Sequence, residues 1–447
     1  MKSLIRKITP KFIIQAYHRT LAFLGAFFYG NPSQKMIVIG VTGTNGKSTS
    51  SNLIAKVLEG AGYKVGLCST FNFKIGNEEW ANDTKITMPG RFRLQKYLKK
   101  MADVGCQYAV VETSSEGIEQ FRHKNINYDV AVFTNLTPEH IESHGSFENY
   151  KHAKGMLFQS FGAKKKFNGK DAKKISIANI DDEHAEFFLS FPADEKWGFG
   201  KTGESARFKS NKEKLRNIVE AKDTQTDSSG VKFYVNGTCF QLKLLGKFNI
   251  SNALSAITVG LSQSIDIEKI KEALEKVTQI PGRMELVKTN RNFVVIVDYA
   301  HEPAGLEQVY KTVSPFPHNK LISVLGSQGG GRDKRKRPVL GRLAGSYTDY
   351  VIVTNEDPYD DDPMEIINEV AAGTLEIDGK ELGKNVWKIL ERKEGVEKAL
   401  SLANEGDIVV ITGKGAEQNM VIENGKKVPW DDRRTVREIL NGSKHGC

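Results

Sequence analysis

The sequence predicts an α/β protein with two doubly wound domains, and three observations support this fold class. Short apolar runs rich in β-branched residues recur along the chain, as in YAVVE at 108–112. Segments with helical periodicity separate these runs, and strands that alternate with helices form mostly parallel sheets. The chain has 447 residues, which is enough for more than one domain, and the alternation starts again after Pro281.

Residues 1–35 come before the first predicted strand and contain an apolar-rich segment at 12–29. Gln15, His18 and Arg19 interrupt this segment, whereas a bilayer span needs about 20 mostly apolar residues. The pattern therefore predicts an amphipathic helix. Two placements are compatible with it: the helix packs on the protein, which we favour, or it lies at a membrane surface.

Residues 36–282 are predicted to form a central domain with a mostly parallel, doubly wound sheet. In the helix at 49–59, apolar residues recur on one face. The Lys-rich stretch at 165–245 differs in character and predicts a more irregular, partly antiparallel insertion. The strands are predicted at 36–41, 108–112 and 130–134, and the helices at 49–59, 93–101, 249–261 and 267–277.

A break at Ile280-Pro281-Gly282 is the predicted domain boundary, because Pro and Gly together interrupt regular structure. Beyond it, residues 283–447 are predicted to form a second, Rossmann-like α/β C-terminal domain. Its strands are expected at 293–298, 321–325, 350–354 and 407–412.

The composition restricts the partners of the chain. Lys and Arg number 64 and Asp and Glu 54, a net charge of +10, which suits anionic ligands or simply a solvated surface. No arginine-rich tail is present, so nucleic acid is not an expected partner. The four cysteines lie far apart without metal-binding spacing, which is typical of a reduced, cytoplasmic protein.

Between the first strand and the helix at 49–59 the chain reads TGTNGKS, residues 42–48. Glycines there let backbone N–H groups approach phosphates, and the helix N-terminus adds the positive end of its dipole. Lys47 can reach the outer phosphates and Ser48 can bind Mg²⁺. The strict P-loop spacing would place Gly at position 41, where this chain has Val41. The loop is a variant, and the predicted ATP-binding residues are Gly43, Thr44, Asn45, Gly46, Lys47 and Ser48.

Four further motifs follow in order: VETSSEG at 111–117, TNLTPEHIESHG at 134–145, GKFNISNA at 246–253, and PGRME at 281–285 with DYAH at 298–301. Together with the variant loop, this series resembles the Mur ligase family over residues 36–440. The resemblance implies a cytoplasmic, ADP-forming ligase that adds amino acids to the peptidoglycan precursor. It implies activation of a carboxylate by ATP as an acyl phosphate, which an amine then attacks. The most similar branch of the family adds the third amino acid.

The resemblance also implies two Mg²⁺ sites beside ATP. Ser48, Glu112 and His140 are the implied metal ligands, together with Lys154 as its carbamate, N6-carboxylysine. A carbamate converts the lysine cation into a carboxylate-like anion that can bind metal. The implied catalytic residues are Lys47, Glu112, His140 and Lys154.

The family pattern assigns residues to ATP and to the acceptor. Asn252 is implied to lie near the adenine, Arg283 near the phosphates and Asp298 at the ribose. Closure of the second domain would then complete the ATP site. The implied acceptor-binding residues are Thr87, Ser114, Gln120 and Arg122.

The incoming amino acid is expected to bind the second domain. The family member that adds meso-diaminopimelate has the motif D-N-P-R, and here the matching residues are Glu356-Asp357-Pro358-Tyr359. Tyr359 replaces the arginine, which argues against diaminopimelate. The carboxylates that follow suit the distal ammonium of L-lysine, although a solvated acidic loop is the alternative. The implied amino-acid contacts are Glu356, Asp357, Gly413 and Glu417.

The acceptor and the enzyme class leave alternatives open. Family members of this type carry an N-terminal domain that binds the UDP-sugar, and only about 35 residues precede the phosphate loop here. The acceptor is then UDP-N-acetylmuramoyl-L-alanyl-D-glutamate bound in another way, or a different, lipid-linked molecule. Folylpolyglutamate synthetase and the ligase-like subunit of the lipid II amidotransferase are neighbouring enzyme alternatives. A non-catalytic scaffold would not need the second metal site. A monomer with small-molecule substrates is expected, with peripheral membrane contact through residues 12–29 as the further option.

Overall fold

A computed structural model describes residues 9–137, 145–202 and 215–442, which form two compact units. The first unit is built from Met1–Gln225, Lys232–Leu242 and Phe248–Val277. The second is built from Thr226–Val231, Lys243–Lys247 and Thr278–Cys447. Each unit has a central sheet and is described by itself.

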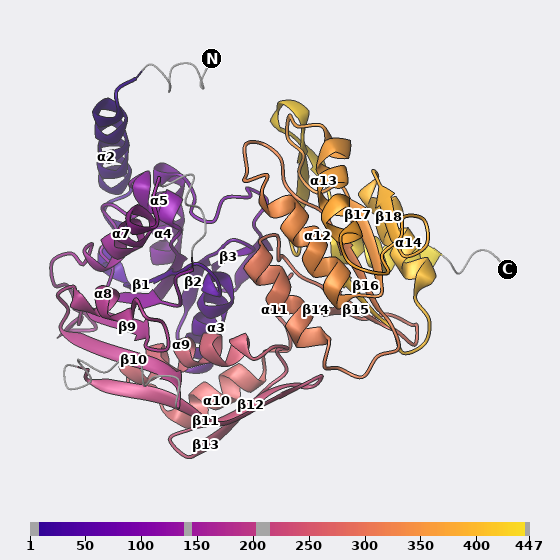
Figure 1. Cartoon of the computed structure of the whole chain (residues 1–447). Helices are drawn as coiled ribbons and strands as arrows, with labels where there is room; N and C mark the ends of the chain where they lie inside the picture. Colours follow the sequence, from indigo (N-terminus) through magenta and orange to yellow (C-terminus); the bar gives the residue numbers. More distant parts are fainter. Residues whose placement is uncertain (1–8, 138–144, 203–214, 443–447) are drawn as a thin grey trace. The chain divides into compact units, whose positions relative to one another are not determined.

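An 11-stranded sheet forms the centre of the first unit (Figure 1). Its seven central strands run parallel to one another, from β11 to β2. In order across the sheet the strands are β13 (Thr238–Leu242), β12 (Gly230–Val235), β11 (Asn217–Asp227), β10 (Glu195–Lys201), β9 (Ile175–Asn179), β6 (Val130–Phe133), β1 (Ile37–Thr42), β5 (Tyr108–Glu112), β2 (Val65–Cys68), β3 (Asn72–Ile75) and β4 (Glu78–Ala81).

The strands in the middle of this parallel region are mostly apolar, because helices cover both of their faces. Every residue of β1 and of β5 is buried. At one edge of the sheet, β3 and β4 turn back as antiparallel strands. All four residues of β4 are exposed to solvent, in contrast to the parallel centre.

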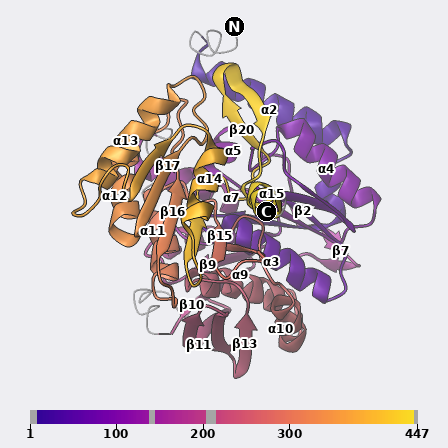
Figure 2. The ribbon, with the colours of Figure 1, turned by 90° about the vertical axis from the view of Figure 1, so that its right-hand side faces the viewer.

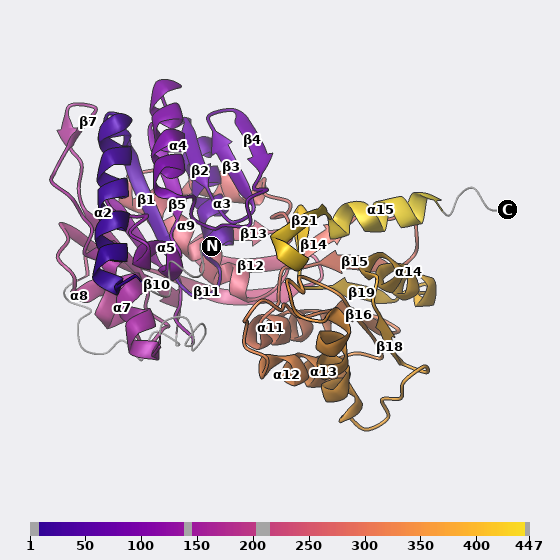
Figure 3. The same ribbon diagram turned by 90° about the horizontal axis from the view of Figure 1, so that it is seen from above.

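The helices of the first unit confirm the predicted alternation, with ends that differ from the predicted ones by a few residues. The N-terminal helix α2 begins at Lys11, ends at Phe28 and packs against α4 (Figure 3). No described helix is both long enough and apolar enough to span a bilayer. The other helices are η1 (Pro32–Lys35), α3 (Lys47–Gly60), α4 (Arg91–Asp103), α5 (Ser115–Glu119), α7 (Phe147–Phe158), α8 (Ala185–Ser190), α9 (Phe248–Ser262) and α10 (Ile267–Glu275).

The stretch at 165–245 is more regular than the sequence predicts. The hairpin of β7 (Lys166–Phe167) and β8 (Lys170–Asp171) is antiparallel, as expected. However, β9, β10 and β11 extend the central sheet in parallel, so most of this stretch is no insertion. The reason is that β9 is buried at all five positions, while its Lys-rich flanks hide this short strand in the sequence.

A buried ion cluster joins three segments of the first unit. Asp129, just before β6, accepts hydrogen bonds from the backbone N–H of Val38 at 2.8 Å and from Lys174 Nζ at 3.0 Å. Lys165 Nζ lies 2.7 Å from the other side of the same carboxylate. The Asp129 side chain is 1% exposed. Two ammonium groups therefore share one buried carboxylate. Backbone carbonyls and the side-chain oxygen of Asn127 accept their other hydrogen bonds.

The second unit has a six-stranded sheet with helices on both faces (Figure 2). All strand pairs are parallel except β14 with β15. Across the sheet the strands are β14 (Glu285–Val287), β15 (Val294–Val297), β19 (Ile408–Ile411), β16 (Leu321–Leu325), β17 (Tyr350–Thr354) and β18 (Val386–Ile389). The helices are α11 (Pro303–Val313), α12 (Lys336–Tyr347), α13 (Pro363–Leu375), α14 (Arg392–Leu402) and α15 (Asp432–Gly442).

Two features of the second unit matter for its site. A hairpin of β20 (Asn419–Ile422) and β21 (Lys426–Pro429) follows the last strand of the sheet. Arg392, the first residue of α14, forms a fully buried ion pair with Asp432 at 2.8 Å. The same guanidinium donates to the backbone oxygens of Asn355 and Thr412, so it ties together the ends of β17 and β19.

Candidate functional site

In the loop between β1 and α3, two positions have a backbone conformation and close neighbours that favour glycine. Gly43 has φ +154° and Gly46 has φ +80°, which L side chains rarely adopt. A Cβ on Gly43 would overlap the hydroxyl of Thr134, and one on Gly46 would overlap the amide oxygen of Asn252. Glycine at these two positions therefore lets Thr134 and Asn252 approach the loop backbone closely. The Gly-rich turn directly before the N-terminus of α3 fits a phosphate cradle.

Neighbouring residues hold the loop in place. Lys47 Nζ donates to the backbone oxygen of Thr44 at 2.6 Å. The backbone N–H of Asn45 donates to Asn135 Oδ1 at 2.8 Å, and Thr134 Oγ1 donates to the backbone oxygen of Asn45 at 2.7 Å. Thr134 and Asn135 were not predicted to contact the loop. Their position directly after β6, the neighbour of β1, is the feature that could have indicated it.

Glu112 and Ser48 meet beside the loop, as predicted. Glu112 ends β5, which is parallel to β1, and its side chain is buried. Ser48 Oγ donates to Glu112 Oε1 at 2.9 Å. Thr70 donates twice to this carboxylate, from its backbone N–H at 2.7 Å and from its hydroxyl at 2.8 Å. Carboxylate and hydroxyl oxygens are ligands that Mg²⁺ prefers, so the donor set fits that cation. Sequence reasoning missed Thr70.

Lys154 also lies at the loop. It is 1% exposed, its Nζ donates to the backbone oxygen of Gly43 at 2.7 Å, and it lies 4.3 Å from the centre of the Tyr150 ring. Predicted ligand His140 lies outside the described residues. Among the residues that are described, no three His, Cys, Asp or Glu side chains gather as a metal site.

The four predicted acceptor residues fall into separate places. Thr87 Oγ1 lies 3.1 Å from Thr70 Oγ1, so Thr87 belongs to the cluster around Glu112. Ser114 Oγ instead accepts from a backbone N–H and caps α5. Gln120 and Arg122 bond to each other at 2.7 Å through their side chains.

Asn252 on α9 is the adenine residue of the prediction, and it lies against the phosphate loop. Its Nδ2 donates to Asn249 Oδ1 at 2.9 Å, and its Oδ1 accepts from Ser50 Oγ at 3.4 Å. The residue is buried, and its amide oxygen fills the space beside Gly46. Asn252 therefore helps to shape the loop itself.

In the second unit, Arg283 and Asp298 lie close together. Asp298 accepts hydrogen bonds from the backbone N–H groups of Met284 and Ala300, each at 2.7 Å. Burial raises the pKa of Asp298, and the charge of Arg283 opposes this shift. The Arg283 guanidinium lies 4.8 Å from the centre of the Tyr299 ring.

The structure brings together the residues predicted to bind the incoming amino acid. The ammonium of Lys414, which is fully buried, lies 2.9 Å from Asp357 and also contacts Glu417. Gly413 has φ +104°, and a Cβ there would overlap Glu356 Oε2. Lys414 was not among the predicted residues, although it lies within the same GKGAE motif at 413–417.

Glu356 differs from the other carboxylates of this group. Its side chain is fully buried, and neither carboxylate oxygen has a hydrogen-bond partner among the described residues. Burial raises the pKa of Glu356 to about 7, and the charge of Asp357 adds to this shift. Arg392 and Lys414 oppose it. The site therefore holds a carboxyl group that a cation would stabilise in its charged form.

The acidic run after Pro358 has structural partners. Asp360 accepts from the backbone N–H of Asn424 at 2.7 Å, and Asp362 caps α13 by accepting from a backbone N–H at 2.8 Å. Asp361 lies 3.3 Å from the buried guanidinium of Arg337. Each of the three carboxylates therefore has a structural partner, although Asp360 and Asp362 are also exposed. The two predictions for this run, a solvated loop or contacts with a substrate ammonium, both stay predictions.

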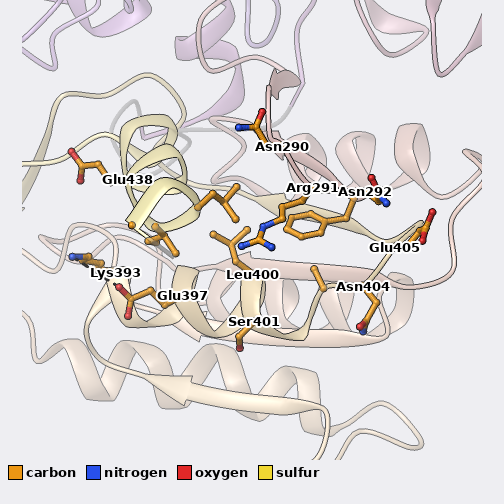
Figure 4. Close-up of a pocket in the computed structure, with 15 residues that line it drawn as sticks. Asn290, Arg291, Asn292, Lys393, Glu397, Leu400, Ser401, Asn404, Glu405 and Glu438 are labelled. Atoms are coloured by element: carbon orange, nitrogen blue, oxygen red, sulfur yellow. Dashed lines mark ion pairs between the residues drawn. The ribbon is translucent and has the colours of Figure 1, made fainter. Parts of the chain in front are cut away.

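The second unit also contains a separate cavity of about 960 Å³ (Figure 4). It is bordered by the loop before β15 and by the helices α14 and α15. None of the predicted site residues in the described chain lines it. The lining residues are Asn290, Arg291, Asn292, Phe293, Lys393, Glu397, Leu400, Ser401, Ala403, Asn404, Glu405, Glu438, Ile439, Leu440 and Gly442.

Comparison with known families matches both halves of the chain. Residues 41–260 match the Mur ligase middle domain, and residues 282–415 match the Mur ligase glutamate ligase domain. The first match includes the phosphate loop, Glu112 and Lys154. The second includes Asp298, Glu356 and Gly413.

Individual relatives match along most of the chain. The UDP-N-acetylmuramyl-tripeptide synthetase of Roseiflexus sp. is 37% identical over 94% of this chain and 81% of its own length. The UDP-N-acetylmuramoyl-L-alanyl-D-glutamate–2,6-diaminopimelate ligase of Bacillus cereus is 35% identical over 97% of this chain and 84% of its own.

Solved structures share the fold. A UDP-N-acetylmuramoyl-L-alanyl-D-glutamate–2,6-diaminopimelate ligase matches with a TM-score of 0.59 and 29% identity, over 92% of this chain and 80% of that one. The folylpolyglutamate synthase of Mycobacterium tuberculosis matches with a TM-score of 0.67 over 88% of this chain and 91% of its own. At 18% identity this second likeness concerns the fold alone.

Proposed function

We propose the amino acid and the acceptor on the premise that this chain belongs to the Mur ligase family and is an ATP-dependent ligase of peptidoglycan synthesis. The chain adds L-lysine to UDP-N-acetylmuramoyl-L-alanyl-D-glutamate. The tripeptide synthetase relative supports this acceptor by its name. The reaction consumes ATP and a nucleotide-linked precursor, so we place it in the cytoplasm. Residues 36–282 and 283–447 are the proposed functional domains of a monomer.

The observation that carries the choice of lysine is the buried carboxylate of Glu356, whose oxygens lack partners in the described chain. A second ammonium on the substrate would neutralise it. Meso-diaminopimelate, the substrate in the name of the Bacillus cereus relative, carries a distal carboxylate as well. Tyr359 itself carries no positive charge, although Arg332 lies beside it, and Glu356 would repel the distal carboxylate.

The proposed reaction begins with transfer of the γ-phosphoryl group of ATP to the acceptor carboxylate, which gives an acyl phosphate and ADP. The amine of the amino acid attacks the acyl carbon, and the tetrahedral intermediate releases phosphate and leaves an amide. The backbone of Gly43–Ser48 would bind the phosphates, and Lys47 would neutralise their developing charge. For this, Lys47 would exchange its bond to Thr44 for the nucleotide.

Two Mg²⁺ ions would shield the charge between ATP and the acceptor carboxylate. Ser48 and Glu112 are the proposed ligands of one ion, and His140 with the carbamate of Lys154 of the other. Lys154 is buried at the loop, where a positive charge costs solvation, and this favours the modification. A carbamate nitrogen keeps one hydrogen, so the bond to Gly43 can persist.

The other proposed contacts divide between the substrates. Asn252 would contact the adenine, Arg283 the phosphates and Asp298 the ribose. Thr87, Ser114, Gln120 and Arg122 would contact the acceptor. Glu417 would hold the α-ammonium of the amino acid beside Gly413 and Asp357.

Mass spectrometry of the product tests the amino acid directly. The full chain is incubated with ATP, Mg²⁺, UDP-N-acetylmuramoyl-L-alanyl-D-glutamate and equal amounts of L-lysine and meso-diaminopimelate. We expect the lysine tripeptide in about tenfold or greater excess, since one unpaired charge in a buried site is worth at least ~1.4 kcal/mol. A diaminopimelate product would refute the choice of lysine. Phosphate release that depends on no amino acid would refute the ligase reaction on this acceptor.

Variants test the role of Glu356. Glu356→Gln removes the charge with little change in shape and should raise the KM for lysine about tenfold or more. Asp362→Asn is the matched control, because the Asp362 side chain caps α13 and asparagine still caps a helix. An equal effect of both substitutions would show that general acidity, and not Glu356, attracts lysine.

A further inference from the structure

The outer face of α2 is the largest apolar feature that the ligase reaction does not use. Of the large hydrophobic side chains exposed in the described residues, seven belong to this one helix. Their exposed fractions run from 44% to 74%. They are Phe12, Ile13, Tyr17, Phe23, Leu24, Phe27 and Phe28.

Helix geometry places these seven side chains on one side. At 3.6 residues per turn, counted from Phe12, they fall within an arc of about 160°. The residues that pack on the body fall in the remaining arc. Ala22 and Ala26 are 1% exposed. A Cβ at the position of Gly25 would lie 3.5 Å from the Cα of Phe92 on α4. The helix is therefore anchored through small residues, and its aromatic side faces solvent.

Positive charge predominates in and beside this helix. The first acidic residue of the sequence is Glu59, whereas Lys11 and Arg19 lie in α2 and Lys2, Arg6 and Lys7 precede it in the sequence. On α4, against which α2 packs, Arg93, Lys96 and Lys100 are exposed, and Asp103 is the one acidic residue of that helix. An apolar helix face without anions of its own, next to more cations than anions, complements an anionic lipid surface.

We propose that the outer face of α2 binds the surface of an anionic phospholipid bilayer, with the aromatic side chains inserted among the acyl chains. The helix would lie in the plane of the interface, since it does not qualify as a bilayer span. Insertion would reach about 5–10 Å below the headgroups. The body of the first unit, attached through Ala22 and Ala26, would remain in water.

Co-sedimentation of the full chain with vesicles tests the proposal. The vesicles contain either equal parts of phosphatidylglycerol and phosphatidylcholine or phosphatidylcholine alone. We expect binding to the anionic vesicles, and binding that weakens at high salt because the screening length shortens. Failure to sediment with anionic vesicles would overturn the proposal, as would equal binding to both compositions.

A triple variant separates the α2 face from general hydrophobicity. Phe12→Ser, Phe23→Ser and Phe27→Ser together should lower the partition coefficient by about 100-fold or more, since each ring is removed from the acyl region. The control replaces three exposed leucines of the second unit, Leu375, Leu382 and Leu390, by serine. This control should bind vesicles like the original chain, and equal losses in both variants would refute the assignment to α2.

Two further measurements show whether the Phe variant is folded and whether α2 binds a second copy of the chain instead of lipid. Ligase turnover with soluble substrates should be unchanged in the Phe variant, because α2 contributes none of the proposed catalytic residues, and this shows that the variant folds. Sedimentation velocity without vesicles tests the alternative occupant, a second copy of the chain. A dimer that the Phe variant abolishes, with no vesicle binding, would overturn the membrane proposal.

Discussion

Glu356 is a buried carboxyl group, and its surroundings do not compensate the negative charge of its ionised form. Three cations act on it, and each is already paired: Arg392 with Asp432, Lys414 with Asp357 and Lys336 with Glu302. Removing a carboxylate from water without a partner disfavours its charged form. In the absence of amino acid, the side chain therefore holds a proton more tightly than an exposed glutamate does.

This imbalance predicts a pH-dependent stability. The pKa of Glu356 rises from 4.5 to about 7 in the folded chain, so the unfolded chain loses the proton first as pH rises, and stability falls between these values. Glu356→Gln should remove the loss and stabilise the protein at pH 8, by on the order of 3 kcal/mol at 1.36 kcal/mol per pKa unit. Denaturant unfolding at pH 8 and pH 4 measures it. A gain of equal size at pH 4 would contradict the ionisation argument.

Local motifs explain why some site residues could be predicted and others could not. Lys47 and Ser48 are defined by a strand, a turn and a helix that are contiguous in the sequence. Thr70 is separated from Glu112 by 42 positions and lies in no motif, so only the pairing of β2 with β5 brings it there. The partners of Asp360 and Asp361 likewise depend on tertiary contacts, which composition does not reveal.

At the scale of the element, the glycine before α3 has both a positive φ and a close neighbour. Gly46 has φ +80° and adjoins Asn252, while Gly62, after the end of α3, has φ +90° with no other atom within 4 Å of a built Cβ. Alanine at either position adds about 1 kcal/mol of backbone strain. Only Gly46→Ala should also displace the loop, and weaken ADP binding about tenfold or more. Titration with a fluorescent ADP analogue measures the difference, and equal weakening in Gly62→Ala would show that strain alone matters.

The bounds of strands were predicted correctly where nearly all residues of the strand are buried. The strands β5, β16 and β17 have the predicted bounds, because both faces are covered and the apolar run is unbroken. β18 was missed because it is only partly buried. β9 was missed because lysines flank it. The apolar pattern thus identifies a strand only when both of its faces are buried and it lies outside a Lys-rich stretch.

At the scale of the whole molecule, each unit has its own buried ion cluster, so the units can be destabilised separately. Arg392→Met leaves Asp432 buried without its guanidinium and should destabilise the second unit by about 3–5 kcal/mol. Lys174→Met should destabilise the first unit by less, because Lys165 still pairs with Asp129. Limited proteolysis with mass spectrometry should find faster cleavage within 278–442 in the first variant and within 36–202 in the second. Faster cleavage throughout both units in either variant would show that they unfold together.

The resemblance that runs through the sequence predicted both halves of the molecule, because each half carries its own motifs. The division at residue 282 stays a prediction, as does the domain closure that it implies. Motifs record which residues contact a ligand, but the path of a peripheral element such as α2 depends on its packing partners. The sequence therefore left two placements for this helix. Its contact with α4 shows that its inner face packs on the first unit, and the proposed lipid contact concerns its outer face.

The exposed strand β4 has a consequence for how the protein behaves at high concentration. A wide sheet with an open edge offers unpaired N–H and C=O groups to strands of other molecules, which leads to aggregation. Here the last strand at this edge is only four residues long and carries Glu78 and Glu79, both exposed. A second copy approaching edge to edge would meet like charges. The short acidic strand β4 thus disfavours pairing of this edge of the sheet with strands of other protein molecules.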